Sequence, residues 1–444
     1  MRELPTRLRY LCGLMSFLFL FAASSPAQQS SSSTAPVRLT LADAIQRARH
    51  NSVVYQAALT DAGLAQEDKK QAVTALLPSV NYNNSVTSTQ GNGTPGQVKF
   101  IANNAIHEYI SQGNVHESLD LAGIAGARKA SANASVAKAR AEIASRGLIV
   151  TVVQSYYAVA AAKNKVEAAK KAADEGDRFL KLTGELERGG EVAHSDVIKA
   201  ELQANDRKRQ LQEANLAFLN ARLDLAVLVF PNFNDNYELA EDLHAAIELP
   251  TSAEVESRAA RDNPDIKAAL ETVHAADHGV SAARAGYLPS LGFDYFYGID
   301  APRFATRTNG LSNLGSSAVA TLNIPVWNWG ATQSRVKQAQ LQRDQAKREL
   351  SLTQKKLLAS LKSLYAEAQT AADELTSLQR SADLGAESLR LITLRYKNGE
   401  STVLEVVDAQ NTATATDSAY QDGAVRYRVA LANLQTLTGA LTTP

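Results

Sequence analysis

Two carboxylates lie one helical turn apart, directly after a turn signal near the C-terminal end of the chain. In the stretch YKNGESTVLEVVDAQ, residues 396–410, the pair Asn398-Gly399 is typical of a helix end, and Glu405 and Asp408 follow it. Side chains of this type and spacing make a small patch of negative charge. They equally suit a solvated helix face or the positive end of the next helix. Both interpretations stay open until the surrounding elements are known.

The remaining residues offer little other chemistry. His274 and His278 are four residues apart, a spacing that can bind zinc on a helix. The glutamate of the metalloprotease motif does not lie between them, so we interpret them as surface histidines. No serine, histidine and aspartate lie in a recognisable nucleophile elbow. We therefore expect no catalytic residue, no metal site and no cofactor.

Charge and cysteine content exclude several classes of protein. The 444 residues carry 46 acidic and 46 basic side chains, so no bulk field attracts nucleic acid, and we expect no nucleic-acid partner. The only cysteine, Cys12, lies in an apolar segment near the N-terminus. The rest of the chain can form neither disulfides nor thiolate metal sites.

Residues 1–27 have the pattern of a secretory signal peptide. Three arginines precede the apolar run at 11–23, and a small-x-small site predicts cleavage after about Ala27. A membrane anchor is the alternative, but the run is shorter than the roughly 20 residues that a spanning helix needs. No later stretch approaches about 18 uninterrupted apolar residues, so no further spanning helix is expected.

The chain contains two copies of one pattern, displaced by roughly 210 residues. The copies share a Leu-Pro-Ser entry, a Gly followed five residues later by Arg, and a glycine turn followed by an acidic residue and valine. We therefore divide the chain into the signal peptide, a first repeat at 28–229, a linker or equatorial segment at 230–251, and a second repeat at 252–444. The matching stretches are 74–86 with 285–297, 120–128 with 328–335, and 187–201 with 396–410.

Each copy predicts a helix, two strands and a very long helical segment broken once near its end. Helices of about 35 residues are expected to begin near Leu41 and Ser252, and a Leu-Pro-Ser proline ends each.

Strong helix formers then predict nearly unbroken helix from Gly123 to about Arg188 and from Gly330 to about Lys397. At 1.5 Å per residue, roughly 65 residues make a rod close to 100 Å long. Such a rod must pack beside similar rods.

Narrow apolar seams favour close helix packing near the second turn. They place Leu389, Ile392 and Tyr396 on one helix face, and Val403, Val406 and Val407 on another. Such seams suit a coiled-coil-like wall. An ordinary helical bundle is the alternative.

The strands carry an alternation typical of membrane-spanning β-barrels. Apolar or aromatic residues occupy the odd positions from Leu291 to Ile299, and a second alternating segment covers 314–326. In the first copy Val80, Tyr82 and Val86 alternate with polar residues, and the return strand is expected within about 104–120. Four strands cannot close a barrel, and open edges cannot lie in hydrocarbon. The chain must therefore oligomerise if these strands lie in a membrane.

These residues resemble the TolC-like outer membrane efflux proteins, the outer membrane factors of tripartite pumps and type I secretion systems. The resemblance covers nearly the whole mature chain through the order and duplication of its motifs. It implies a trimeric channel-tunnel in the outer membrane of a Gram-negative bacterium, with most of the chain in the periplasm. Twelve strands, four per chain, would form a transmembrane β-barrel, and twelve coiled-coil-like helices an all-α barrel. The stretches that carry the resemblance are LTLADAIQRARHN at 39–51, ARDNPDIKAAL at 260–270, both Leu-Pro-Ser entries, and YRVALANLQTLTG at 427–439.

The resemblance also implies roles for the turn regions. Glu405 and Asp408 match an acidic ring at the periplasmic entrance, which favours cations. Tyr396, Ser195 and Asp196 match contacts that hold the entrance shut, and Ser401 occupies the place of an arginine in that lock. The turns would dock a periplasmic adaptor protein, with an inner membrane transporter as the third component. The docking turns read Gly189-Gly190-Glu191 and Asn398-Gly399-Glu400.

Two functions are consistent with these observations. The first is a passive exit duct in the outer membrane, and the second is a secreted periplasmic coiled-coil scaffold without channel activity. The aromatic-bearing strand at 291–299 and the signal peptide favour the duct.

Overall fold

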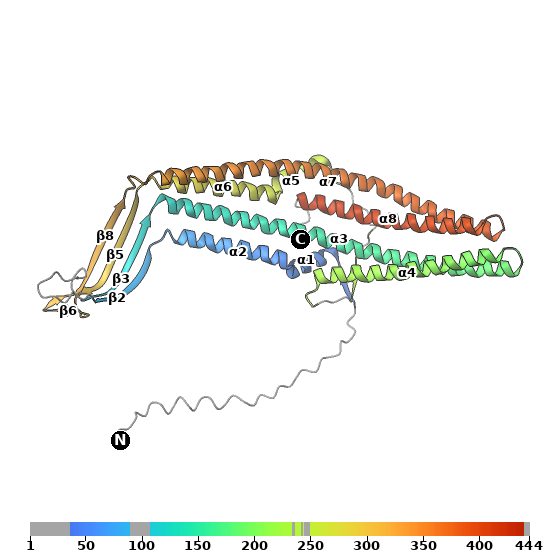
Figure 1. The fold of residues 1–444 in the computed structure, drawn as a ribbon, viewed down its shortest axis with the longest axis horizontal. Helices are drawn as coiled ribbons and strands as arrows, with labels where there is room; N and C mark the ends of the chain where they lie inside the picture. The colour runs from blue at the N-terminus through green and yellow to red at the C-terminus, as the bar shows by residue number, and fades with distance from the viewer. Residues whose placement is uncertain (1–35, 89–106, 233–235, 241–242, 244–248, 439–444) are drawn as a thin grey trace, which may run out of the picture.

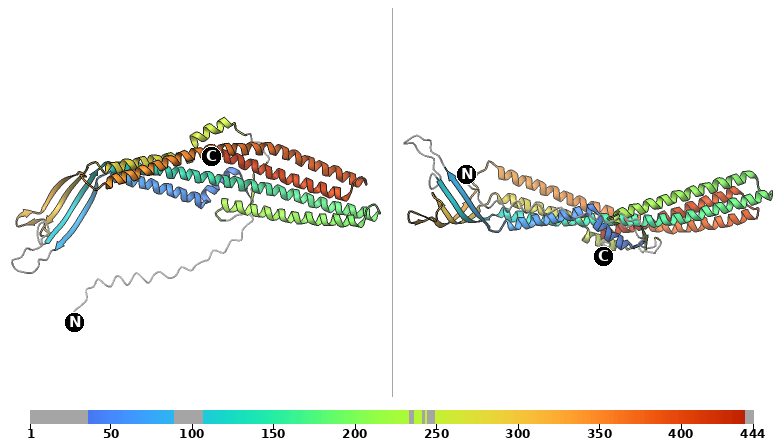
Figure 2. Two further views of the ribbon diagram at one scale, coloured as in Figure 1. Left: turned by 45° about the horizontal axis from the view of Figure 1, so that its top comes forward. Right: turned by 90° about the horizontal axis from the view of Figure 1, so that it is seen from below.

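The protein is an elongated body with a four-stranded sheet at one end and long helices over the rest of its length (Figure 1). The computed structural model describes residues 36–88, 107–232, 236–240, 243 and 249–438. The predicted signal peptide at 1–27 lies outside the described residues. Two further views show the sheet inclined to the helical body (Figure 2).

The first half of the chain runs through two helices, two long strands and a helical hairpin. The predicted long helix is confirmed, because α3 ends at Arg188 and begins at Leu121, where the Asp120 carboxylate caps it by accepting from the Gly123 N–H. The elements are β1 (Val37–Leu39), α1 (Leu41–Asn51), α2 (Val53–Thr74), β2 (Ser79–Ser88), β3 (His107–Leu119), α3 (Leu121–Arg188) and α4 (His194–Val229).

The second half has the same succession of long elements. Its long helix is also confirmed, since α7 begins directly after Gly330 and ends at Lys397. The polar connection between its two long strands contains a small hairpin, β6 and β7, with Asn309 and Gly310 at positive φ in the turn. The elements are β4 (Tyr237–Leu239), α5 (Ser252–Asp262), α6 (Pro264–Ala285), β5 (Ser290–Ala301), β6 (Arg307–Thr308), β7 (Leu311–Ser312), β8 (Leu314–Asn323), α7 (Ala331–Lys397) and α8 (Val403–Thr438).

The expectation of two continuous helices of about 35 residues is wrong. The first is divided at Ser52, whose hydroxyl accepts from the Tyr55 N–H at 3.3 Å and so begins α2. The second is divided at Asn263, whose side chain accepts from the Ile266 N–H at 3.1 Å, with Pro264 as the first residue of α6. Each of these side chains caps the start of a separate helix, so each predicted helix is two helices.

The four long strands form one antiparallel sheet in the order β2-β3-β5-β8. The predicted alternation on β5 is confirmed, because Leu291, Phe293, Tyr295 and Tyr297 are all between 39% and 54% exposed on one face. Strands β2 and β8 are the edges, and no further strand in the described part of the chain pairs with them.

The other face of the sheet is polar. His116 lies opposite Asp294 in the register, and its Nδ1 is 2.8 Å from an Asp294 carboxylate oxygen. Asn114 donates to the same oxygen at 3.3 Å. A sheet with one exposed apolar face and one polar face is typical of a strand wall between lipid and water.

The middle of the body is held by a core around α1, α3 and α4. Strand β1 pairs in parallel with β4, and the Tyr156 hydroxyl of α3 donates to the Leu39 carbonyl at 3.0 Å. Both Tyr156 and Leu39 are fully buried. The segment predicted as a linker at 230–251 thus contributes a strand, which sequence reasoning missed.

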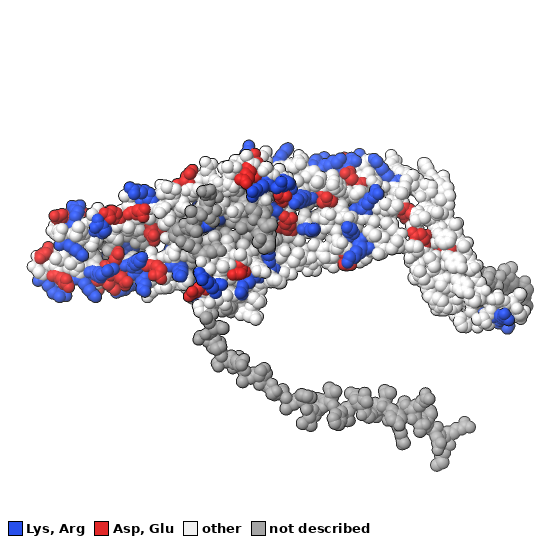
Figure 3. All heavy atoms as spheres, turned by 180° about the vertical axis from the view of Figure 1, so that it is seen from behind, with Lys and Arg blue, Asp and Glu red and all other residues white. Residues whose placement is uncertain are grey.

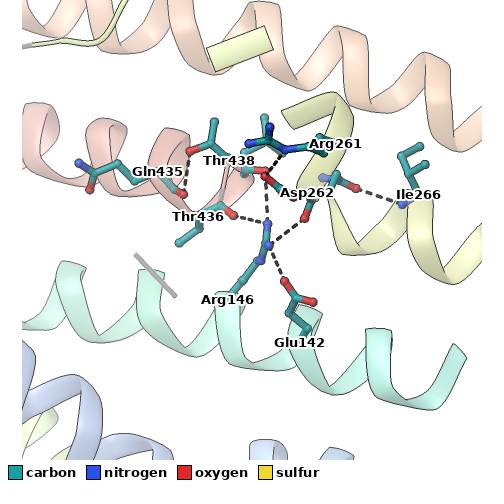
Figure 4. A network of polar contacts seen from close by, with 10 residues as sticks. Glu142, Arg146, Arg261, Asp262, Ile266, Gln435, Thr436 and Thr438 are labelled. Carbon is teal, nitrogen blue, oxygen red and sulfur yellow. Dashed lines mark hydrogen bonds and ion pairs between the residues drawn. The ribbon is translucent and has the colours of Figure 1, made fainter. Parts of the chain in front are cut away.

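The second-half helices are tied to α3 by the buried guanidinium of Arg146 (Figure 4). It donates to the Thr436 carbonyl at 2.6 Å and to the Asp262 carbonyl at 3.0 Å, and it pairs with Glu142. These carbonyls lie in the last turns of α8 and α5, where helices leave carbonyls without partners. One side chain of the first half therefore caps two helices of the second half.

One helix in the described part of the chain, α3, contains a stretch long and apolar enough to cross a membrane by length and composition. From the sequence we expect no membrane-spanning helix after residue 27. Half of that stretch is buried within the protein, as in the core helix of many proteins outside membranes. The stretch is weak evidence for a spanning helix.

Candidate functional site

Two helical hairpin turns lie together at the end of the body far from the sheet (Figure 1). Each turn follows the Schellman pattern, with Glu191 N–H donating to Leu186 O and Glu400 N–H donating to Arg395 O, both at 2.9 Å. Gly190 and Gly399 adopt φ of 76° and 73°. A Cβ at either glycine would meet nothing within 4 Å, so glycine is needed there for backbone conformation and not for space.

The predicted acidic pair follows the second turn on the first turns of α8, and both side chains are exposed. Ser401 Oγ donates to Glu405 Oε2 at 2.5 Å, while Thr402 Oγ1 accepts from the Glu405 N–H at 3.3 Å. This is a variant of the helix capping box. The hydrogen bond from Ser401 lowers the pKa of the Glu405 carboxyl below its ordinary value, with smaller contributions from Thr402 and Arg395. Glu405 therefore helps to cap the start of α8, in addition to any role of the Glu405 and Asp408 carboxylates at an entrance.

A small apolar core joins the two hairpins beside these turns. Its buried members come from α3, α4, α7 and α8, and the predicted seam residues Ile392 and Val407 pack against it. The remaining predicted seam residue, Leu389, lines a groove instead. The buried members are Phe179, Ala200, Tyr396, Val403 and Val406.

Tyr396 is the predicted gate residue with the clearest contacts. It is 3% exposed, its hydroxyl lies 3.3 Å from Thr183 Oγ1, and its ring lies 5.1 Å from that of Phe179. Burial raises the pKa of the Tyr396 hydroxyl, the Thr183 hydrogen bond opposes that rise, and the charge of Asp196 adds to it. Tyr396 therefore ties α7 to α3 through Thr183, a residue that sequence reasoning missed.

Among the described residues, the hydrogen bonds and ion pairs of the other predicted gate residues are local. Asp196 pairs with Lys199 one turn further along α4 at 3.3 Å, and Ser195 is exposed. Ser401 bonds to Glu405 and so takes part in the α8 cap.

A groove of about 760 Å³ runs between α3 and α7 beside the turns. Arg178 and Lys181 line it from α3, and Arg390 and Lys397 line it from α7. Gln410 of α8 lies at its floor, 6% exposed. Glu175 and Glu185 of α3 also line the groove, so its charged lining is mixed, with basic groups on both sides.

Charge is distributed unevenly along the molecule. Figure 3 shows acidic and basic side chains spread over the helical body and dense around the turns, with few on the sheet. Both tryptophans of the chain, Trp327 and Trp329, lie between β8 and α7, where the sheet meets the helices. They are 75% and 88% exposed, with ring centroids 5.8 Å apart. Exposed tryptophans at the edge of an apolar surface are typical of a membrane boundary.

A four-stranded apolar-faced sheet on long helical hairpins is the fold of outer membrane channels. The outer membrane channel CmeC of Campylobacter jejuni superimposes with a TM-score of 0.78 at 18% identity, over 90% of this chain and 85% of that chain. This likeness establishes the fold alone.

Sequence comparison gives the family. The family model "Outer membrane efflux protein" matches residues 255–440. The chain is 22% identical to the outer membrane protein TolC of Vibrio cholerae over 373 residues, 83% of each protein. It is 25% identical to OprJ of Pseudomonas aeruginosa over 54% of the chain, and the match spans 48% of OprJ. The family match and these relatives together support a TolC-like outer membrane efflux protein.

Proposed function

We propose that the chain forms, as a homotrimer, a passive exit duct through the outer membrane for substrates that an inner membrane transporter and a periplasmic adaptor supply. The observation that carries this proposal is the sheet, whose apolar face is exposed and whose edges β2 and β8 are open. Three copies would join edge to edge into a closed barrel of twelve strands, which satisfies the backbone in lipid. The helices would then extend into the periplasm as a tunnel.

The turn end would form the entrance of this duct. Three chains would bring about six carboxylates from Glu405 and Asp408 into a narrow mouth, which favours cations. Tyr396, Ser195, Asp196 and Ser401 would lie where neighbouring hairpins close. Adaptor docking at the two turns is supported by their exposure and by the groove beside them. The proposed docking residues are Gly189, Gly190, Glu191, Asn398, Gly399 and Glu400.

Planar-bilayer recording of the purified protein, with chemical cross-linking on the same sample, tests the duct. We expect a small, cation-selective conductance from a cross-linked trimer. A water-soluble monomer without conductance would instead favour the periplasmic scaffold.

Tryptophan fluorescence of the wild-type protein reports on the membrane boundary, because both tryptophans of the chain lie in one connection, between β8 and α7. In vesicles we expect brominated lipids with bromine near the headgroups to quench the emission more than lipids brominated at the chain ends. A Trp327→Phe/Trp329→Phe variant gives the background. Quenching by aqueous iodide with no quenching by either lipid would place the sheet outside a bilayer.

Ser401→Ala is expected to shift the pH response of the mouth. The substitution removes the main cause of the lowered Glu405 pKa, so this carboxylate should lose its charge at a higher pH than in the wild type. Cation selectivity, recorded as the pH is lowered, should therefore fall earlier in Ser401→Ala. Ser252→Ala on α5 is the control, because Ser252 Oγ likewise donates to a glutamate four residues on, Glu256, at 3.2 Å. Identical pH profiles for the two variants would refute the link between Ser401 and the entrance charge.

A further inference from the structure

Arg207 is among the largest fully buried side chains of the described protein, at 2% exposure on α4. Nothing in the sequence pattern marks it, because its neighbours Lys208 and Arg209 are charged and exposed. A buried guanidinium must be hydrogen bonded to offset its lost hydration. The hydrogen-bond partners of the Arg207 guanidinium therefore show which helices it connects.

The partners of Arg207 are neutral amides, and one of them belongs to the other hairpin. Nη2 donates to Asn411 Oδ1 of α8 at 3.0 Å, and Nη1 donates to Gln210 Oε1 at 2.8 Å. In the amide orientation that satisfies both groups, Gln203 Oε1 accepts from Nε and Nη2 at 3.1 Å each. Within the described residues no carboxylate lies within 4.0 Å of this guanidinium to form an ion pair.

Gly176 of α3 has no side chain, and this leaves space for Arg207 between α3 and α4. A Cβ at Gly176 of α3 would lie 3.5 Å from Arg207 Cγ and 3.4 Å from the Ala204 Cα. The arginine stem thus packs against α3 while its head reaches α8. Burial lowers the pKa of the Arg207 guanidinium, against the charges of Asp206 and Glu175, so the group is a desolvated cation.

Several polar contacts join the two hairpins, and two of them lie toward the turns. Tyr396 to Thr183 joins α7 to α3, and Arg207 to Asn411 joins α8 to α4. Arg207 lies roughly 20 Å along α4 from its first residue, at 1.5 Å per residue. The second contact thus lies deeper in the body than the first.

We propose that Arg207 is a positioning residue of the entrance, which holds the α3–α4 and α7–α8 hairpins together through Asn411 when the entrance is closed. This inference rests on the proposed channel function. Separation of the hairpins would break the charge-assisted bond to Asn411 and expose the guanidinium to water. The closed state is thus favoured by a contact that the open state lacks.

The test compares Arg207→Gln with Arg209→Gln in bilayer recordings of the trimer. Both variants remove one positive charge from α4, but Arg209 is exposed and its ion-pair partners in the described part of the chain, Asp206 and Glu213, lie on its own helix. We expect Arg207→Gln and Asn411→Ala each to raise the open-state population about tenfold, the size expected for one charge-assisted hydrogen bond. Arg207→Lys should restore part of the closed state.

The two single effects should not add, because both variants remove the same contact. Equal conductance of Arg207→Gln, Asn411→Ala and Arg209→Gln in a conducting trimer would overturn the inference, as would additive effects in Arg207→Gln/Asn411→Ala. Cross-linking and thermal melting check that each variant still forms the trimer. If Arg207→Gln does not form the trimer, the open-state populations of Asn411→Ala and Arg209→Gln are compared instead, and equal populations would overturn the inference. Absence of conductance in the wild type would refute the proposed channel function, and this outcome differs from a conducting trimer in which Arg207 has no effect.

Discussion

Replacing Arg146 by alanine is expected to lower the free energy of unfolding by about 3 to 5 kcal/mol, the cost of removing one partner of a buried, hydrogen-bonded charge. The guanidinium is 7% exposed and serves the carbonyls of Thr436, Leu437 and Asp262 besides Glu142. Alanine would leave these carbonyls buried without a donor, and Glu142 without its cation. The ends of α5 and α8 would lose their common cap.

Denaturant midpoints from far-UV circular dichroism measure this effect, and limited proteolysis near the end of α8 localises it. Arg261→Ala is the matched control, because Arg261 lies close by in Figure 4 but its side chain is 76% exposed and, among the described residues, forms an ion pair with the adjacent Asp262 alone. We expect the control to change stability by less than about 0.5 kcal/mol. Equal midpoints for the two variants would show that Arg146 does not hold the second half to α3.

Removing both entrance carboxylates, by Glu405→Ala with Asp408→Ala, is expected to abolish most of the cation preference of the channel. Under the proposed assembly, three chains would lose about six negative charges from a narrow entrance, where a charge acts strongly on passing ions. Block by multivalent cations should weaken in parallel. Reversal potentials in a salt gradient, with and without a trivalent cation, measure both quantities.

The control removes the same charge elsewhere. Glu254→Ala with Glu256→Ala deletes two exposed carboxylates from α5, midway along the body and far from the turns (Figure 1). Asp408→Ala alone leaves the Ser401 to Glu405 hydrogen bond in place, so it separates loss of charge from loss of the α8 cap. A double variant whose selectivity equals that of the α5 control would contradict the acidic-ring assignment.

The long elements could be predicted from the sequence because their signals are local. Alternation of apolar and polar residues predicted β5 and β8. Runs of helix-forming residues between glycines predicted the ends of α3 and α7 to within a few residues. Strand β3 was harder, and the register shows a reason. Ser111, Gly113 and Glu117 lie opposite Ile299, Tyr297 and Phe293, so polar or small residues of β3 lie beside large apolar residues of β5. Its apolar alternation is therefore weak.

The contacts between elements could not be predicted from the sequence. Arg146, Arg207 and Thr183 have partners on other helices, and those partnerships depend on how distant helices are rotated against one another. Two local signals were present but not used. Asn263-Pro264 is a standard helix start, and it would have divided the second helix correctly. Ser52 is a weaker signal of the same kind.

The open edges of β2 and β8 bear on how quickly the protein can reach the membrane. Each backbone group without a partner costs several kcal/mol in hydrocarbon, so a lone sheet faces a steep barrier to entering lipid. Under the proposed assembly, copies must meet before or while their strands insert. The insertion rate should then depend on chain concentration with an order above one, and dilution should slow the reaction far more than it slows folding of the helices.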